Sequence, residues 1–305
     1  MSGLSEFHGY LDRFSILGNC VVCEGWANHK DLALWYRDHS LTLSVTRVDR
    51  PDLVAALGPD AANWGFSFAA ALPERIVDRT KFRLRFNAGI TVDPTERFAR
   101  HDDGKYTAML DRFRNMVRPG SSMLEIGSRA RSGATYRDWF PAVLDYVGLD
   151  VTEGPNVDVI ADAHHMTRTI QRQFDHMFSM ATFEHILMPW KVALEMNALL
   201  RDGGTALIIS HGAWPLHEQP WDFFRFSIES WRGIFNAHTG FRVLDAQYQY
   251  GAAVVPQYLH SHHHAEMSLG DAYLLSGCLV ERAGPAKVRW DAEASEVYDM
   301  GYSHH

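Results

Sequence analysis

Apolar and polar residues alternate with a period of two over much of the first ninety residues. In LTLSVTRV (41–48) the apolar positions run from Leu41 to Val45 at every second residue, and KFRLRF (81–86) repeats the pattern. Such alternation gives a strand one buried and one solvent-facing side. The stretches VVCEGWA and WGFSFAAAL read as further strands. The pattern predicts a small antiparallel β-sandwich as an accessory domain over residues 1–93.

The periodicity changes beyond Pro94. Between residues 106 and 117 the apolar positions recur every three to four residues, which predicts a helix that ends before Pro119. Short apolar strands then alternate with helical stretches. Strands are expected near residues 122–127, 145–150, 157–161, 174–179, 205–210, 241–250 and 272–281. This alternation predicts an α/β domain over residues 94–290, with a parallel sheet covered by helices on both faces and a tail over 291–305.

The composition and net charge of the chain argue against some kinds of binding partner. The net charge is −8, which argues against a nucleic-acid partner or an anionic membrane surface, since either would call for a basic patch. No apolar run reaches the roughly 20 residues of a membrane-spanning helix, so we expect no integral membrane segment. The chain has 3 cysteines, too few for a disulfide framework, and we expect a reducing, cytoplasmic location. The oligomeric state is left open.

The turn after the first α/β strand has an unusual composition. In parallel sheets the ligand lies beyond the carboxyl ends of the strands. Gly127 lets the chain turn beneath such a ligand, and Gly133 is expected to open the following helix. A dinucleotide fold uses three glycines to approach a pyrophosphate, whereas Arg129 and Arg131 stand here instead. Glu125 would also repel a phosphate, which argues against an NAD-dependent dehydrogenase and favours a cationic or zwitterionic ligand.

Acidic residues follow the next two strands. Asp150 ends the strand YVGLD, where a carboxylate accepts hydrogen bonds from ribose hydroxyls in nucleotide-binding folds. Asp162 and the backbone of Ala163 follow the third strand and are placed to meet the amine and ring nitrogen of an adenine. These positions predict a nucleoside-binding site.

The motifs LEIGSRARSG, YVGLD, DVIADAHH, FDHMFSMATFEHILMPW and LLRDGGTALI follow one another in this order over about residues 105–281. Together they resemble the class I S-adenosylmethionine-dependent methyltransferases. The resemblance implies a Rossmann-like domain of seven strands that binds S-adenosyl-L-methionine. It implies donor contacts around the methionyl group, ribose, adenine and methyl group from Glu125, Gly127, Ser128, Asp150, Asp162, Ala163, His164 and Met180. Arg129 and Arg131 depart from the family's Gly-x-Gly pattern, either as solvated loop residues or as a partner of the donor's carboxylate.

Two further stretches narrow the subclass. FEHILMPWKVALEMNALLRDGG followed by LHEQPWDFFRFS resembles methyltransferases of bacterial sugar and surface-glycan biosynthesis. The N-terminal patches HGYLDRF, CEGWA, RPDL and WGF resemble a small β-module found beside glycan-tailoring enzymes. These resemblances imply O-methylation of a saccharide hydroxyl, on a sugar, an oligosaccharide or a glycan precursor. Two alternatives stay open: an O-methyltransferase of a small aromatic or quinone-type metabolite, and a non-catalytic glycan-binding scaffold with a degenerate methyltransferase domain.

A saccharide hydroxyl is a poor nucleophile until its proton leaves, and histidine is the usual base near neutral pH. His217 is the first candidate for this base and His185 the second, with Glu184 beside it. The alternative for each histidine is a structural bond to a backbone carbonyl. The substrate candidates lie in the irregular stretch after the fifth strand and are Trp214, Trp221, Asp222 and Arg225, whereas Trp231 and Phe235 have the helical spacing of core residues.

The sequence leaves a divalent metal open. Glu184 and His185 resemble part of the E-x-x-E-H motif of metal-dependent quinone-pathway O-methyltransferases, although Ala181 replaces its first acid. The stretch QYLHSHHHAEM supplies further candidate ligands, His260, His262 and His264, and imidazoles of this kind suit zinc or nickel. Adjacent histidines in a loop are also common as solvated residues.

Overall fold

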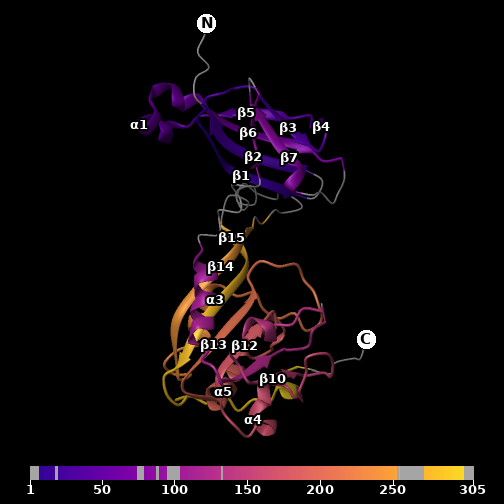
Figure 1. Ribbon diagram of the computed structural model, residues 1–305, viewed down its shortest axis with the longest axis vertical. Helices are drawn as coiled ribbons and strands as arrows, with labels where there is room; N and C mark the ends of the chain where they lie inside the picture. Colours follow the sequence, from indigo (N-terminus) through magenta and orange to yellow (C-terminus); the bar gives the residue numbers. More distant parts are fainter. Residues whose placement is uncertain are drawn as a thin grey trace. The chain divides into compact units, whose positions relative to one another are not determined.

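The computed structural model describes residues 7–17, 20–73, 79–86, 89–94, 104–131, 133–252, 254 and 271–298 (Figure 1). The chain divides into two compact units, Met1–His101 and Asp102–His305. The candidate metal ligands of the stretch 255–270, including His260, His262 and His264, lie outside the described residues. None of the described helices is long and apolar enough to cross a membrane.

The first unit contains two antiparallel sheets of four strands each. One sheet has the order β1 (Gly9–Leu17), β2 (Cys20–Ala27), β6 (Gly65–Ala71) and β5 (Ser44–Val48). The other has the order β4 (His39–Leu41), β3 (Leu32–Tyr36), β7 (Phe82–Phe86) and β8 (Ile90–Val92). The connections carry the short helical segments η1 (Pro51–Leu53), α1 (Val54–Leu57), η2 (Pro59–Asn63) and η3 (Arg79–Lys81).

Both sheets contribute to one apolar core, which includes Val21 and Phe68 from one sheet and Leu34 and Phe82 from the other. In β7 the alternation predicted from the sequence holds, since its phenylalanines and leucine are buried and its arginines are not. Cys23 is buried in the same core, and burial raises the pKa of its thiol. That cysteine therefore has the environment of a packing residue.

The stretch 41–48 does not form the single half-buried strand that its alternation predicts. The chain passes from β4 in one sheet to β5 in the other, with a break between them. Leu41 and Leu43 pack against the core, but Val45 on β5 is 42% exposed. Among the described strands β5 pairs with β6 alone and so forms an edge of its sheet. The side chains of β5 are therefore exposed, although the alternation predicts that every second one is buried.

The second unit is built on one sheet of seven strands. Their order is β11 (Val159–Ile160), β10 (Asp145–Asp150), β9 (Ser122–Ile126), β12 (Phe174–Met180), β13 (Leu200–His211), β15 (Ala272–Arg282) and β14 (Phe241–Ala252). The first five run parallel, whereas β15 is antiparallel to both of its neighbours. The predicted α/β architecture with seven strands is confirmed, and the sheet is mixed rather than wholly parallel.

Helices cover both faces of this sheet, as predicted. On one face α3 (Lys105–Met116) lies along β14 and β13 (Figure 1), and its Phe113 is buried in the same core cluster as Phe178 and Leu207. On the other face the core takes in α4 (Met166–Thr169), α5 (Pro189–Leu199) and α6 (Ile228–Ile234). Trp231 and Phe235 are fully buried there, which confirms their prediction as core residues.

The helix expected after Gly133 does not form. Of the residues described between β9 and β10, only η6 (Arg137–Trp139) is helical, and it is a single turn. Aromatic rings cover the sheet in place of a helix, because Tyr136 and Phe140 pack on Phe178 with ring centroids 5.3 and 5.2 Å apart. Pro141 follows directly and cannot continue a helix, since it lacks a backbone N–H.

Candidate active site

Because the strands run parallel, the candidate residues lie together at the carboxyl ends of the strands. Gly127 follows β9, Asp150 ends β10 and Met180 ends β12, and these three strands run in the same direction. Gly127 has a φ of +77°, a conformation that favours glycine. Thr182, two residues beyond Met180, lies against it, so the turn after β9 and the loop after β12 are in contact.

Glu125 stabilises the turn through hydrogen bonds. Its side chain is buried, and Oε2 accepts hydrogen bonds from Tyr146 Oη at 2.8 Å and from Asn156 Nδ2 at 2.9 Å. The same amide nitrogen donates to the carbonyl of Ser128 at 2.9 Å. Burial raises the pKa of the Glu125 carboxyl although both hydrogen bonds oppose the shift. The structure thus gives this carboxylate partners inside the protein and uses it to hold the loop that begins at Gly127.

Asp150 is ordered by backbone donors. The N–H of Thr152 donates to Oδ1 at 3.1 Å and the N–H of Arg129 to Oδ2 at 3.3 Å. The Arg129 side chain lies beside the same carboxylate, with Nε 4.0 Å from Oδ1. Arg131 instead forms an ion pair with Glu218, with Nη1 2.5 Å from Oε2. Both arginines of the turn therefore have acidic partners, and Arg131 ties the turn to the loop after β13.

Asp162 is held by His164 within η7 (Ala163–His165). Its Oδ1 accepts the His164 N–H at 2.9 Å and lies 2.7 Å from the ring Nδ1. The ring is buried, and its Nε2 accepts the N–H of Met188 at 3.1 Å. Although burial opposes ionisation, these contacts lower the pKa of Asp162. His164 therefore positions Asp162, and its own nitrogens are both engaged within the protein.

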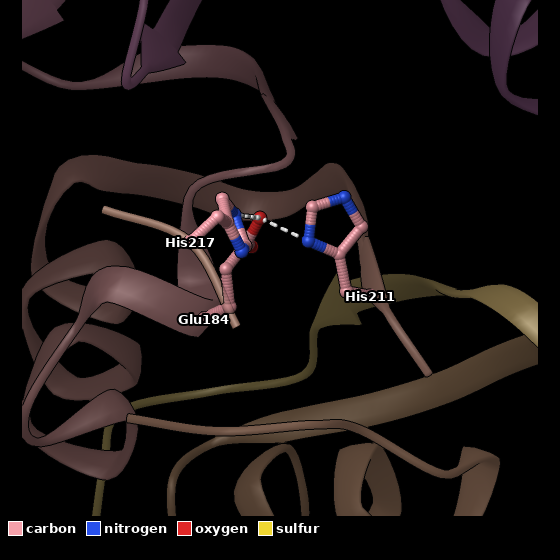
Figure 2. Close-up of side chains that lie close together, drawn as sticks. All are labelled: Glu184, His211 and His217. Atoms are coloured by element: carbon pink, nitrogen blue, oxygen red, sulfur yellow. Dashed lines mark ion pairs between the residues drawn. The ribbon is translucent and has the colours of Figure 1, made fainter. Parts of the chain in front are cut away.

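Glu184 and three histidines, His185, His211 and His217, form a cluster at the carboxyl ends of β12 and β13. Glu184 lies in η8 (Phe183–His185) and is completely buried, while His211 is the last residue of β13. Oε2 of Glu184 accepts from Ser210 Oγ at 2.6 Å, and Oε1 lies 2.8 Å from His211 Nδ1 (Figure 2). Burial opposes ionisation of Glu184, but the adjacent imidazole and hydroxyl outweigh it and lower the carboxyl pKa.

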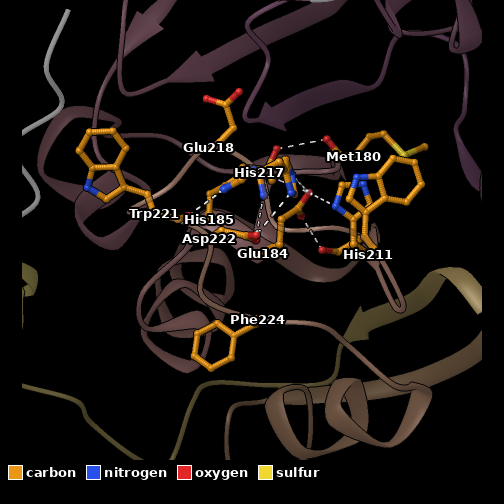
Figure 3. Close-up of polar contacts among 12 residues, drawn as sticks. Met180, Glu184, His185, His211, His217, Glu218, Trp221, Asp222 and Phe224 are labelled. Carbon is orange, nitrogen blue, oxygen red and sulfur yellow. Dashed lines mark hydrogen bonds and ion pairs between the residues drawn. The ribbon is translucent and has the colours of Figure 1, made fainter. Parts of the chain in front are cut away.

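His185 and His217 complete this cluster (Figure 3). Their Nε2 atoms each lie 3.9 Å from Oε1 of Glu184. Their Nδ1 atoms face backbone carbonyls, that of Trp221 at 2.7 Å for His185 and that of Pro215 at 3.2 Å for His217. The two candidate bases are thus neighbours, with ring centroids 4.8 Å apart.

Asp222 and Arg225 build the loop that carries His217. Their ion pair is bidentate, with distances of 2.6 and 2.7 Å, and the Asp222 side chain is 1% exposed. Asp222 also accepts the backbone N–H of His217 at 2.9 Å. Arg225 donates to the carbonyls of Trp214 and Pro215 at 3.0 Å each. The guanidinium holds the pKa of Asp222 well below its usual range. These two residues, candidates for substrate contact, have their charges engaged within the loop.

Trp214 presents an exposed ring at the cluster. It is 41% exposed and stacks on His211, with ring centroids 4.4 Å apart and planes 4° from parallel. Trp221 is partly buried and meets His185 through its backbone carbonyl. Of the two tryptophans, Trp214 therefore offers the open aromatic face beside the imidazoles.

His211 is the residue of this cluster that the sequence analysis missed. It ends the apolar run LIISH, so the signal available was a polar residue at the carboxyl tip of a parallel strand. Its relation to Glu184 depends on the pairing of β13 with β12, which brings together residues 27 positions apart in sequence.

Comparisons with known proteins gave no match to a family model and none to a curated protein. Among solved structures, a putative methyltransferase from Bacillus halodurans is similar at TM-score 0.44 and 15% identity, over 59% of this chain and 98% of that one. An S-adenosylmethionine-dependent methyltransferase from Archaeoglobus fulgidus is similar at TM-score 0.42 and 13% identity, over 57% and 91%. An O-methyltransferase from a polyketide synthase multienzyme of Brevibacillus brevis, in complex with S-adenosyl-L-homocysteine, has TM-score 0.40 and 15% identity, over 62% and 76%.

Proposed function

We propose that this protein transfers the methyl group of S-adenosyl-L-methionine to a hydroxyl of an acceptor, and that the acceptor is a saccharide. The observation that carries the proposal is the pair of carboxylates, Asp150 and Asp162, at the tips of the neighbouring strands β10 and β11. The N–H of Ala161 donates to the backbone carbonyl of Asp150 at 2.9 Å, which keeps the two tips together.

Both carboxylates keep acceptor capacity for a nucleoside. A carboxylate has about four lone-pair sites, and the backbone N–H groups of Arg129 and Thr152 use two of those on Asp150. The remaining sites suit the two ribose hydroxyls. On Asp162 the contacts of the His164 backbone and ring both go to Oδ1, and the side chain is 33% exposed, so Oδ2 suits the exocyclic amine of adenine.

The acceptor would lie between the donor turn and the imidazoles. The ion pair of Arg131 with Glu218 joins the turn after β9 to the loop after β13, one residue from His217. This contact brings the loop that holds the donor beside the candidate bases. Trp214 supplies an open ring next to His211, and such a ring packs well on the apolar face of a sugar.

The transfer itself is an in-line displacement. The acceptor oxygen attacks the methyl carbon, the bond between that carbon and the sulfonium sulfur breaks, and its electron pair stays on sulfur to give S-adenosyl-L-homocysteine. The hydroxyl proton passes to Nε2 of His217, because its Nδ1 faces the carbonyl of Pro215 and so carries the other proton. A base placed in this way contributes about 10²- to 10⁴-fold, and orientation of the two substrates contributes the rest.

Two measurements test the proposal. Calorimetry with S-adenosyl-L-homocysteine should show one donor site per chain, and absence of binding would remove the methyltransferase function. Incubation with methyl-labelled donor and separate panels of saccharides and phenols then tests the acceptor. Label in the saccharides supports the proposal, whereas label in the phenols alone would assign a small aromatic acceptor. Donor binding with label in neither panel would favour the non-catalytic scaffold.

A further inference from the structure

Three imidazole nitrogens converge on a single carboxylate oxygen in the second unit. Around Oε1 of Glu184, Nδ1 of His211 lies at 2.8 Å, and Nε2 of His185 and of His217 lie at 3.9 Å each (Figure 2 and Figure 3). The ligand atoms of Glu184, His211 and His217 all lie within 4.8 Å of one another. Atoms at this spacing could surround a single bound ion.

The closest of these contacts, at 2.8 Å, does not have the geometry of a hydrogen bond. Oε1 of Glu184 and Nδ1 of His211 are both buried, and neither has a hydrogen-bond partner among the residues that the structure describes. Glu184 is 0% exposed and His211 is 7% exposed. Buried polar atoms are nearly always hydrogen-bonded, so two orphaned atoms that face each other need another partner. Two ligands of one zinc-sized ion lie about 3 to 3.5 Å apart, given bonds of about 2.0–2.2 Å. The two atoms, 2.8 Å apart, would need to separate slightly to share such an ion.

The other two imidazoles bring Nε2 within 3.9 Å of the same oxygen of Glu184. The backbone carbonyls of Trp221 and Pro215 accept hydrogen bonds and cannot donate them. Nδ1 of His185 and Nδ1 of His217 must therefore carry the hydrogen in these contacts. In a neutral ring the remaining nitrogen, Nε2, is then an unprotonated acceptor. Unprotonated nitrogens this close to an ionised carboxylate oxygen repel it, and a cation placed between them would remove the repulsion.

We propose that Glu184, His211 and His217 bind a divalent first-row transition-metal ion, with His185 as a fourth ligand. Imidazole nitrogens combined with one carboxylate suit zinc, cobalt or nickel, whereas magnesium prefers oxygen ligands. The outer partners that orient metal ligands are also present. Ser210 bonds the second oxygen of Glu184, and backbone carbonyls fix both rings that offer Nε2.

In the proposed methyl transfer, such an ion would help to bind the acceptor. This catalytic role rests on the proposed function, whereas the metal site itself does not. An ion held here would bind the acceptor oxygen and lower the pKa of its hydroxyl. His217 would then act as a ligand, and the proton would leave to solvent or to a neighbouring group. To reach bonding distance His217 must approach Glu184 more closely than 3.9 Å. Its side chain is 28% exposed and lies in an irregular loop, which leaves room for that movement.

Metal uptake tests the inference directly. The 305-residue chain, stripped with a chelator, is titrated with Co²⁺ and with Zn²⁺ by calorimetry, and the visible absorption of the Co²⁺ form reports the coordination geometry. We expect one ion per chain. His217→Gln should weaken Co²⁺ binding by at least about tenfold, because loss of even an outer partner of a metal ligand costs about 10–100-fold. His211→Gln should have the same effect, and His238→Gln, at an exposed position in the same unit, should have none.

The histidines at positions 260 and 262–264 need their own variant. Replacing these four residues with glutamine should leave the first, tight Co²⁺ ion in place. Loss of uptake in that variant alone, or equal uptake by the wild type and His217→Gln, would overturn the inference. Calorimetry with S-adenosyl-L-homocysteine on the same samples separates the two proposals. Donor binding without metal uptake rejects only the metal site, whereas absence of donor binding rejects the methyltransferase function and leaves the metal result to stand by itself.

Discussion

The side chain of Thr182 occupies the space in which any residue other than glycine at position 127 would place its Cβ. A Cβ built on Gly127 would lie 2.0 Å from Oγ1 of Thr182 and 2.4 Å from Cγ2. Thr182 begins the segment that leads to Glu184, so this contact sets the turn after β9 against the segment that carries Glu184 and His185. The glycine is needed for this close approach as well as for its backbone conformation.

Gly127→Ala should therefore destabilise the protein by more than its backbone angle explains. Gly133 has a nearly identical φ of +79°, but a Cβ at that position would meet no described atom within 4 Å, which makes Gly133→Ala the matched control. The positive φ costs about 1–2 kcal/mol in either variant, and overpacking adds about 1–3 kcal/mol in Gly127→Ala alone. Chemical denaturation measures both. Equal losses in the two variants would show that Thr182 yields without cost.

Asp150→Ala should weaken donor binding, and it should also lower the stability because the backbone N–H groups of Arg129 and Thr152 lose their acceptor. The variant removes the carboxylate proposed to hold both ribose hydroxyls, and hydrogen bonds to a charged group contribute about 1.5–3 kcal/mol. We expect the Kd for S-adenosyl-L-homocysteine, measured by calorimetry, to rise at least about tenfold. Asp145→Ala is the control, because Asp145 lies at the opposite end of the same strand and pairs with Arg172. Unchanged affinity in Asp150→Ala would remove the residue from the donor site.

The strands of the second unit could be predicted because their apolar runs are buried on both faces and separated by clear helical stretches. The aromatic rings that pack on Phe178 could not be predicted. Hydrophobic periodicity reports which residues are buried but not whether a helix or a set of rings buries them, and here Tyr136, Trp139 and Phe140 do so. The same limit explains Val45, since alternation does not reveal that the chain changes sheets.

The cluster was only partly predictable for a related reason. Glu184, His185 and His217 could be singled out because they follow strand ends, where ligands lie in α/β folds. His211 belongs to a strand by its pattern, and only the register of β13 beside β12 places it next to Glu184. Contacts between separate loops depend on pairing over long sequence distances, which local patterns do not encode.

Glu125→Gln should change the pH dependence of stability. Burial raises the pKa of this carboxyl above its ordinary value of 4.5, so its neutral form is the one that suits the folded state. Its favourable contribution is complete below the ordinary pKa and is lost as the pH rises through the raised value. Glutamine stays neutral and can still accept from Tyr146 and Asn156.

The melting temperature of Glu125→Gln relative to the wild type should therefore rise between about pH 4 and pH 7. Asp145→Asn provides a control, because Arg172 lowers the pKa of Asp145 and the contribution of this carboxylate is complete above its ordinary pKa of 3.8. The melting temperature of that variant relative to the wild type should stay nearly constant between about pH 5 and pH 7 and should rise only as the pH falls below that ordinary value. A relative melting temperature of Glu125→Gln that falls with pH would show that the ionised carboxylate is the favoured form.

Asp222→Asn should loosen the loop that carries His217 while sparing the proposed donor site. The variant removes one charge of a bidentate pair and leaves Arg225, whose side chain is 24% exposed, without its carboxylate. Loss of hydrogen bonds to a charged group predicts a decrease of about 2 kcal/mol in the free energy of unfolding. Glu229→Gln, which breaks an exposed ion pair with Arg232, should cost under about 1 kcal/mol.

The pH dependence and the kinetics of Asp222→Asn distinguish its role in the loop from a general loss of stability. Because Arg225 lowers the pKa of Asp222, the contribution of the pair is present above the ordinary carboxyl pKa of 3.8 and is lost only as the pH falls through the lowered value. The stability difference between the wild type and the variant should therefore be constant near neutral pH and shrink in acid. Because Asp222 also accepts the His217 N–H, turnover with a methyl acceptor should fall while the Kd for S-adenosyl-L-homocysteine stays within about twofold. Donor binding that weakens as much as turnover would place Asp222 in the donor site instead.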